Sequence, residues 1–391
     1  MAITGSAFGE KRSVLRYGMV GGGPGSFIGD VHRRAIALDG KVQLVAGSFS
    51  DVEEEVLQTG RELGLDEDRM YLTYQEMAKK EAAREDGIDF VSIVVPNFLH
   101  YSVARTFLEA GISVVCEKPL CFNVAQGEEL RDIAKAKGCL FCVTYTYTGH
   151  VMAKQAREMI KNGEIGEVRV VMAEYPQDWL IESDEELGMQ GAWRTNPKLS
   201  GRSNCLGDIG SHAENFVNYI TGLKIKKLCA KMDIKVAGRA LDDNSQVLLE
   251  YENGATGTLW CSQIAIGNDN ALRVRIFGKQ GSIDFVQEDC NYLKVTKKGG
   301  PTMIYSRGTG VMGEVASSFN RVPSGHPEGF YEAYANIYSA YVAALCDKKD
   351  GKEVDESTYG YPTIDMGIDG VKFVNKCCDS NDAGSVWVDF E

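Results

Sequence analysis

The sequence has few histidines, no long apolar run and no excess of positive charge. Five histidines in 391 residues leave little material for a histidine-rich metal centre. No window approaches about 18 consecutive apolar residues, which excludes a membrane-spanning helix. The formal net charge is -13, which argues against nucleic acid or an anionic membrane surface as a partner, because both need a basic face. A small anion held by backbone amides is still compatible with this charge.

The first residues, MAITGSAFGEKR, lack the apolar stretch of a signal peptide. Eleven cysteines in a chain of this length are not a disulfide framework, so we expect reduced thiols and a cytoplasmic protein. Cys139 and Cys142 have the CxxC spacing. Their segment, CLFCVTYTY, predicts a strand in which positions three apart face opposite sides, so we expect buried thiols there rather than a redox or zinc site.

What is present is the composition of a packed globular protein, 44% hydrophobic and 25% charged, over a length that favours two domains. Strand-like and helix-like segments alternate in the first third of the chain. The expected strands are SVLRYGMV, KVQLVAGSF, IDFVSIVVP, ISVVC and LFCVTY. Asn123 and Gln126 form a capping-box pattern at the start of one intervening helix. This alternation predicts an α/β fold over residues 1–147, a doubly wound parallel sheet of the Rossmann type that binds a dinucleotide.

The pattern changes after residue 147. Extended segments follow one another in the middle of the remaining sequence, and ENGA and GKQG are typical of hairpin turns. We therefore expect residues 148–391 to form a second, α+β domain with a large, mainly antiparallel sheet.

A glycine-rich loop, GMVGGGPGSFIGDVHRRA, joins the first expected strand to the first expected helix. In this context Gly21 and Gly23 allow a tight turn and the close approach of a pyrophosphate, and we expect the helix to begin after Gly29. The residues between them that would line the cofactor site are Gly25, Ser26, Phe27 and Ile28. The spacing is longer than in the usual G-x-G-x-x-G pattern, so PGSFIG contains an insertion, and a purely structural turn is the alternative.

The end of the second expected strand, VAGSFSDVEEE, indicates which nicotinamide cofactor is bound. Ser48 or Phe49 lies where such folds usually have the acidic residue that binds ribose. No arginine or lysine lies nearby to accept a 2′-phosphate, and the acidic residues Asp51, Glu53 and Glu54 would repel one. The segment favours NAD, with NADP as the alternative.

The segment VVCEKPLCF places Glu117, Lys118 and Pro119 at the carboxyl end of a buried strand. Ligands bind at this edge of open α/β sheets. A proline directly after a lysine restricts the backbone and can form a cis peptide bond. The alternative is a lysine that merely ends a strand at the surface.

The segment CLGDIGSHAENFVNYITG predicts a helix from about Ile209 to Ile220, with Asp208 and His212 four residues apart on one face. A carboxylate beside an imidazole suits general base catalysis, because the carboxylate orients the ring and favours its protonated form. One alternative is an N-cap aspartate with an unrelated histidine. The other is a metal-binding pair, but with so few histidines we expect no metal.

Together these motifs resemble the Gfo/Idh/MocA family of NAD(P)-dependent sugar and polyol oxidoreductases. The resemblance spans nearly the whole chain and rests on the glycine loop, VVPNFLH at 94–100, EKP at 117–119 and GDIGSH at 207–212. AWRTNPKLSG and GHPEGFYEAYANIY are similar to a subgroup of that family. The resemblance implies a Rossmann domain followed by an open-faced sheet domain, with the active site in the cleft and assembly into a homodimer or homotetramer.

The resemblance also implies roles for individual residues. Lys118, Asp208 and His212 would form the catalytic set: the histidine accepts the substrate hydroxyl proton, the lysine hydrogen-bonds the same oxygen, and the aspartate orients substrate and histidine. The residues along the cofactor would include Pro96, Asn97, His100, Glu117 and Lys118.

Substrate-contact candidates come from segments that could line the cleft. Trp193 and Arg194 lie in an irregular, polar stretch, which favours ligand contact. The further candidates are Tyr145, Tyr147, Trp179 and His326. For the two tyrosines and Trp179 a place in the core is the stronger alternative.

The function expected from these residues is NAD-dependent oxidation of a secondary hydroxyl of a sugar, glycoside or inositol. One alternative is a non-catalytic NAD-binding regulator of the same fold, which has no need of Lys118, Asp208 and His212 together. Another is an enzyme that keeps NAD(H) bound and cycles between two sugar substrates, as a glycoside 3-dehydrogenase does.

Overall fold

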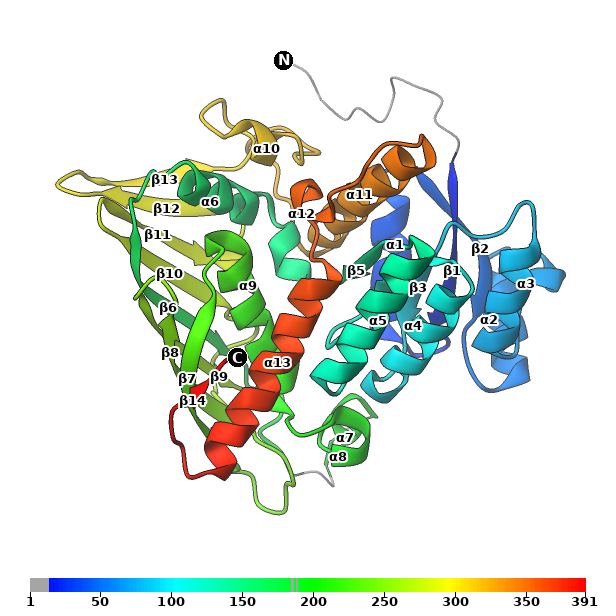
Figure 1. Ribbon diagram of the computed structural model, residues 1–391, viewed down its shortest axis with the longest axis horizontal. Coiled ribbons are helices and arrows are strands. Elements are labelled where there is room, and N and C mark those ends of the chain that lie inside the picture. The colour runs from blue at the N-terminus through cyan, green and yellow to red at the C-terminus, as the bar shows by residue number, and fades with distance from the viewer. Residues whose placement is uncertain (1–13, 184–185, 188) are drawn as a thin grey trace. The chain divides into compact units, whose positions relative to one another are not determined.

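The computed structural model describes residues 14–183, 186–187 and 189–391 (Figure 1). The chain forms two compact units. We call residues 14–149 with 330–368 the Rossmann unit, and residues 150–329 with 369–391 the sheet unit. Residues 330–368, which follow the extended segments in sequence, thus belong to the first unit.

The Rossmann unit is built on a five-stranded parallel sheet in the order β2-β1-β3-β4-β5. Its strands are β1 (Leu15–Gly21), β2 (Val42–Ser48), β3 (Phe90–Val94), β4 (Ser113–Cys116) and β5 (Phe141–Val143). Every residue of β3 and β4 is buried, as expected for strands covered on both faces. The strand order reverses between β1 and β3, and the carboxyl ends of these strands are where such sheets bind ligands.

Helices cover this sheet. They are α1 (Phe27–Ala37), α2 (Glu53–Glu62), α3 (Tyr74–Ala83), α4 (His100–Glu109), α5 (Val124–Lys137), α11 (Phe330–Lys349) and α12 (Glu356–Tyr359). Helix α1 packs against α11, while α4 packs against α3 and α5. The capping-box prediction is confirmed, because Asn123 Oδ1 accepts a hydrogen bond from Gln126 N at 3.0 Å and α5 ends at Gly138, whose φ is 63°.

The sheet unit is built on nine strands in the order β13-β12-β11-β10-β6-β9-β8-β7-β14. They are β6 (Val168–Pro176), β7 (Ile225–Asp233), β8 (Asn244–Tyr251), β9 (Thr256–Ser262), β10 (Arg273–Gly278), β11 (Gly281–Val286), β12 (Tyr292–Lys297), β13 (Thr302–Ser306) and β14 (Val388–Asp389). All neighbouring strands are antiparallel except the parallel pair β6 and β9. The predicted hairpins are confirmed, since ENGA joins β8 to β9 and GKQG joins β10 to β11.

Helices of the sheet unit are α6 (Val151–Lys161), α7 (Met189–Arg194), α8 (Pro197–Ser200), α9 (Ser211–Thr221), α10 (Glu314–Ser317) and most of α13 (Ile364–Asp382). Both α6 and α9 pack on one face of the sheet (Figure 1). Side chains that point to this face, such as Leu249, Leu259 and Phe285, are buried in the core. Alternate side chains on β6 and β8 point away and are exposed, so the opposite face is largely open.

The α/β fold predicted from the sequence is therefore confirmed, with a parallel sheet followed by a mainly antiparallel one. Cys139 and Cys142 are buried thiols, as expected. Among the described residues, each helix is too short or too polar to cross a bilayer.

Candidate active site

The glycine loop leaves β1 at Gly21, where the backbone has a φ of +82°. A Cβ added there would lie 2.6 Å from the carbonyl oxygen of Val94, so the loop passes directly over the end of β3. A Cβ at Gly29 would lie 2.4 Å from the Cα of Gly22, so the helix packs equally closely on the loop. Both contacts require glycine, and they bring backbone amides to the carboxyl edge of the sheet.

The helix after this loop begins earlier than expected. Ser26 is the N-cap, since its Oγ accepts a hydrogen bond from Gly29 N at 3.2 Å, and α1 starts at Phe27. The expected start after Gly29 is therefore wrong: the serine hydroxyl satisfies the Gly29 amide in the first turn, which offsets the low helix propensity of that glycine. The helix N-terminus thus directly follows the loop, next to Gly25, around which an added Cβ would meet nothing within 4 Å. Free amides beside open space suit a pyrophosphate, so the loop fits a dinucleotide.

The segment after β2 contains an acidic residue that the sequence did not single out. Ser48 is buried, and Asp51, Glu53 and Glu54 are exposed. Glu55 is half-buried and its Oε2 accepts a hydrogen bond of 2.5 Å from the Ser50 hydroxyl. Its place in the first turn of α2, reaching back to a serine before the helix, is the signal that could have identified it.

Glu117 lies at the end of β4 and is almost fully buried. Its Oε1 accepts hydrogen bonds from His32 Nε2 at 2.8 Å, Thr144 Oγ1 at 2.6 Å and Tyr334 OH at 3.0 Å. Its Oε2 accepts from the backbone N of Lys118 at 3.1 Å. Burial by itself raises the pKa of this carboxyl, but the hydrogen bonds from His32 and Thr144 and the charge of Lys118 lower it to about 2. Glu117 is therefore a carboxylate that anchors the backbone of Lys118.

The hydrogen-bond network of Glu117 continues through His32 on α1. His32 Nδ1 lies 2.6 Å from Tyr338 OH on α11, which lies 2.9 Å from Ser92 Oγ on β3. Because Glu117 is ionised, His32 donates from Nε2 to that carboxylate. None of these three partners was expected from the sequence, since the contacts join elements that are far apart in the chain.

The peptide bond between Lys118 and Pro119 is cis, in agreement with the sequence. The Pro119 carbonyl oxygen lies 2.6 Å from His100 Nδ1, and His100 Nε2 lies 2.9 Å from Val95 O. Burial lowers the pKa of His100, against the opposing effect of these two carbonyls. The ring of His100 thus ties the segment after Lys118 to the end of β3.

The remaining Rossmann-unit candidates differ in exposure. Pro96 is exposed and Asn97 is half-buried, in the turn that follows β3. Tyr145 and Tyr147 are 1% and 6% exposed, which places both in the interior beside β5.

In the sheet unit, Asp208 lies on a π-helical turn (Leu206–Gly210) that runs directly into α9. The sequence predicted an ordinary helix here, because its apolar spacing fits either geometry. His212 follows in the first turn of α9 and is 8% exposed. Asp208 Oδ2 accepts a hydrogen bond from Gln263 Nε2 at 2.9 Å and lies 3.4 Å from Arg194 Nε.

Arg194, which pairs with Asp208, also lies against two tryptophan rings. Its guanidinium carbon lies 4.3 Å from the ring centroid of Trp193 and 5.6 Å from that of Trp179. Trp179 is 41% exposed, so part of an indole ring beside a carboxylate–guanidinium pair is open to solvent. Three of the predicted substrate residues thus cluster around one predicted catalytic residue. His326 lies in an exposed loop, where its carbonyl oxygen accepts a hydrogen bond from Arg307.

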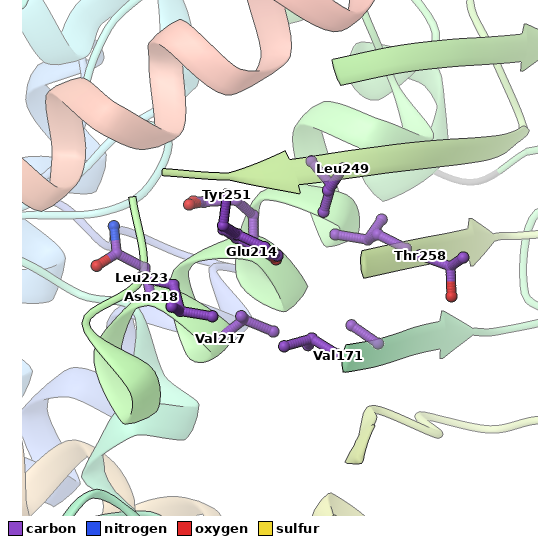
Figure 2. Close-up of a pocket in the computed structure, with 10 residues that line it drawn as sticks. Val171, Glu214, Val217, Asn218, Leu223, Leu249, Tyr251 and Thr258 are labelled. Carbon is purple, nitrogen blue, oxygen red and sulfur yellow. The ribbon is translucent and has the colours of Figure 1, made fainter. Parts of the chain in front are cut away.

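A small cavity lies between α9 and the sheet (Figure 2). It is lined by Glu214 and Asn218 of α9 and by apolar residues such as Val171 and Leu249. Its volume of about 10 Å³ has room for one water molecule and not for a sugar. Burial and the nearby charge of Asp369 raise the pKa of Glu214 to about 8. Asn215, the next residue on α9, is 1% exposed, and neither polar atom of its side chain has a hydrogen-bond partner in the described part of the chain.

Comparison with known proteins extends this description. Residues 15–145 match the model of the oxidoreductase family, NAD-binding Rossmann fold, and residues 153–284 match that of the GFO/IDH/MocA C-terminal domain. The uncharacterized oxidoreductase YfiI of Bacillus subtilis is 39% identical over 96% of this chain and 97% of its own. Levoglucosan dehydrogenase of Pseudarthrobacter phenanthrenivorans is 26% identical over 72% of this chain and 76% of its own.

Two crystal structures of an inositol dehydrogenase homolog from Azotobacter vinelandii share the fold. One is complexed with NAD+ and the other with NADH and myo-inositol. That protein is 37% identical to this chain, with 96% of this chain and 97% of that chain covered and TM-scores of 0.91 and 0.89.

Proposed function

Because this chain belongs to the Gfo/Idh/MocA family of oxidoreductases and carries its NAD-binding Rossmann domain, we propose that it is a dehydrogenase acting on a secondary hydroxyl of a sugar, glycoside or inositol. The observation that carries the substrate class is the exposed indole of Trp179 beside the Asp208–Arg194 pair. An aromatic face stacks on the apolar face of a sugar ring, while the charged pair offers hydrogen bonds to ring hydroxyls.

The proposed chemistry divides the work among three side chains. His212 accepts the proton of the reacting hydroxyl, Lys118 hydrogen-bonds the same oxygen, and Asp208 orients substrate and histidine. Bound NAD+ supplies the acceptor for the hydride that leaves the carbinol carbon. The alcohol thereby becomes a ketone, with one hydride and one proton removed. The hydrogen bond from Lys118 N to Glu117 supports this assignment, because it fixes the backbone from which the lysine side chain projects.

The relatives' names narrow the substrates to be tried. The homolog from Azotobacter vinelandii was crystallised with myo-inositol, and another relative acts on levoglucosan by its name. We therefore expect a cyclic polyol or an anhydro sugar or glycoside to be oxidised. The test is a panel of inositols, levoglucosan and alkyl glucosides with NAD+, followed by NADH absorbance. Absence of NADH with every compound would contradict the proposal and favour a regulator of the same fold.

The role of Trp179 can be tested on whichever substrate is found. Trp179→Ala should raise KM about tenfold and change kcat less, because an aromatic contact of this kind contributes to ground-state binding. The matched control is Trp387→Ala, since Trp387 is also exposed and also lies near a cation, Lys227, at 5.0 Å. Equal KM values for the two variants would remove Trp179 from the substrate site.

A second candidate is an enzyme that keeps its cofactor bound and alternates between two sugar substrates. The purified protein would then carry NADH or NAD+ through gel filtration and would lose it only on denaturation. An absorbance spectrum of the purified protein, before and after adding a sugar, separates this candidate from one with an exchanging cofactor.

We also propose a homo-oligomer that uses the open face of the nine-stranded sheet. Val170, Met172, Leu248 and Phe277 are 36–49% exposed and alternate with buried residues along β6, β8 and β10. An apolar face of this kind is typical of a protein interface. A second copy fits it, because some ionic groups on the same face are already paired within the chain, as Arg273 is with Asp284 at 2.8 Å.

A further inference from the structure

The π-helical turn that carries Asp208 is held by a carboxylate from another part of the chain. Asp242 is buried, and its Oδ1 accepts hydrogen bonds of 2.8 Å from Ser203 Oγ and Asn204 N. Its Oδ2 accepts from Leu206 N at 2.8 Å and Ser245 Oγ at 3.0 Å. Asp242, which lies in another part of the chain, therefore accepts backbone hydrogen bonds at the start of the helical turn and acts as its cap. This fixes the backbone of the turn but leaves the Asp208 side chain to be oriented by other groups.

Gln263 contacts that side chain directly. It is fully buried just after β9, and its Nε2 donates to Asp208 Oδ2 at 2.9 Å. Its Oε1 accepts from Asn204 Nδ2 at 2.8 Å, and Asn204 Nδ2 also reaches Asp242 O at 3.2 Å. The orientation of both amides follows from chemistry: a carboxylate and a carbonyl oxygen can only accept, so the NH2 groups must face them. A single chain of donors thus runs from Asn204 through Gln263 to Asp208.

The backbone of Gln263 is fixed as well. Its N donates to Asp243 O at 2.9 Å, and its carbonyl oxygen accepts from Leu180 N at 3.1 Å. Leu180 O in turn accepts from the buried Arg239 at 2.9 Å. The residue that contacts Asp208 therefore also anchors the segment containing Trp179. A side chain fixed at both its backbone and its amide is well suited to set the angle of a neighbouring carboxylate.

From this geometry we infer that Gln263 is a positioning residue for the reaction, which acts by orienting the Asp208 carboxylate and does not itself touch the reacting atoms. The inference rests on the proposed function, in which Asp208 orients substrate and His212. Asp208 Oδ2 is contacted by two side chains, the uncharged amide of Gln263 and the charged guanidinium of Arg194. The amide orients the carboxylate without adding a charge beside it, while Arg194 is the cation that pairs with it.

The decisive variant is Gln263→Glu, because the new carboxyl is a donor only while it is protonated. Next to Asp208 its pKa is raised, since two adjacent carboxylates repel each other. At low pH it replaces the amide, and at high pH it repels Asp208. We expect kcat of Gln263→Glu to be within about threefold of wild type near pH 5 and to fall roughly ten- to hundredfold below it near pH 8, while KM changes less. Gln263→Leu should lose activity at every pH.

The matched control is Gln280→Glu, which adds the same charge to the exposed hairpin turn between β10 and β11 and should leave the pH profile unchanged. A wild-type pH profile for Gln263→Glu, or full activity of Gln263→Leu, would overturn the inference while leaving the proposed function in place. If wild type oxidises no substrate, the proposed function fails separately. Thermal unfolding then tests the contact between Gln263 and Asp208. The Tm of Gln263→Glu should fall further below that of wild type as the pH rises from about 5 to about 8, and a difference that does not change with pH refutes the contact.

Discussion

At the scale of single residues, the candidate site depends on two carboxylates held by different means. Glu117 is buried and accepts four hydrogen bonds, one of them from the backbone of Lys118. Asp208 is partly exposed and is held by an amide and a guanidinium. The first is a fixed structural charge, while the second can still bind a substrate hydroxyl.

Replacing the proposed base gives a direct prediction. His212→Ala should lower the oxidation rate by about 10²- to 10⁴-fold, the usual contribution of general base catalysis. NAD affinity should stay near the wild-type value, because His212 belongs to the sheet unit. Imidazole ionises near neutrality, so the wild-type rate should rise with pH through one ionisation that the variant lacks. If the variant keeps both its rate and this rise, the base is another residue, and Lys118 would be examined next.

Cofactor preference is a second prediction at this scale. Glu55 is the acidic side chain of its segment that is both half-buried and bonded to Ser50. If it binds the adenosine ribose, Glu55→Gln should reduce the preference for NAD over NADP about tenfold, by removing a charged acceptor and a repulsive charge. The control is Glu53→Gln, an exposed residue of the same turn. The ratio of kcat/KM values for the two cofactors measures the effect, and equal ratios in both variants would exclude Glu55.

At the scale of elements, the sequence predicted what local spacing determines and missed what distant contacts determine. The cap of α5 and the hairpins follow from neighbouring residues, and both are confirmed. The contact of His32 with Tyr338 joins positions 306 apart, and Asp242 caps a turn 38 residues away. The π-helical turn was missed for a related reason: an i,i+4 pair fits an α-helix equally well, and the distant carboxylate that favours the wider turn leaves no local pattern.

The contact between α1 and β4 predicts a pH-dependent stability. The pKa of Glu117 is lowered to about 2, below its value in an unfolded chain, so its bonds stabilise the fold above about pH 4.5 and this stability is lost as pH falls. His32→Leu removes one donor and should cost about 1–3 kcal/mol at pH 7, and less near pH 4. Tyr338→Phe, which leaves the donors to Glu117 in place, should show a smaller and pH-independent loss. Chemical denaturation at several pH values measures both.

Glu214 on helix α9 should give the opposite pH dependence of stability. The pKa of Glu214 is raised to about 8 by burial and by Asp369, against the influence of Lys224 and Asn218; Tyr251 lines the same cavity. The folded state therefore keeps a proton that the unfolded chain releases above about pH 4.5, so stability falls as pH rises toward 8. Glu214→Gln should remove this loss and raise Tm most near pH 8. The exposed Glu252→Gln is the control, and identical pH profiles for wild type and Glu214→Gln would refute the prediction.

At the scale of the whole molecule, the class of each sheet was predictable because strand–helix alternation and hairpin spacing are properties of long segments. The open face of the nine-stranded sheet gives a prediction about assembly. Leu248→Glu should shift the protein toward monomer in analytical ultracentrifugation, because a charge on this face opposes association with a second copy. Val315→Glu is the control, since Val315 is 58% exposed on α10, which packs against α6. A wild-type protein that sediments as a monomer would refute the proposed interface.

The return of residues 330–368 to the Rossmann unit has a consequence for biosynthesis. Tyr334 and Tyr338, which complete the hydrogen bonds of Glu117 and His32, leave the ribosome only after strands β6 to β13 of the large sheet have been made. Until these residues have been synthesised, the nascent nucleotide-binding unit lacks one hydrogen-bond partner of the buried acid and one of the imidazole. A chain stopped at residue 149 would keep every glycine of the loop and still lack the helix that closes its interior.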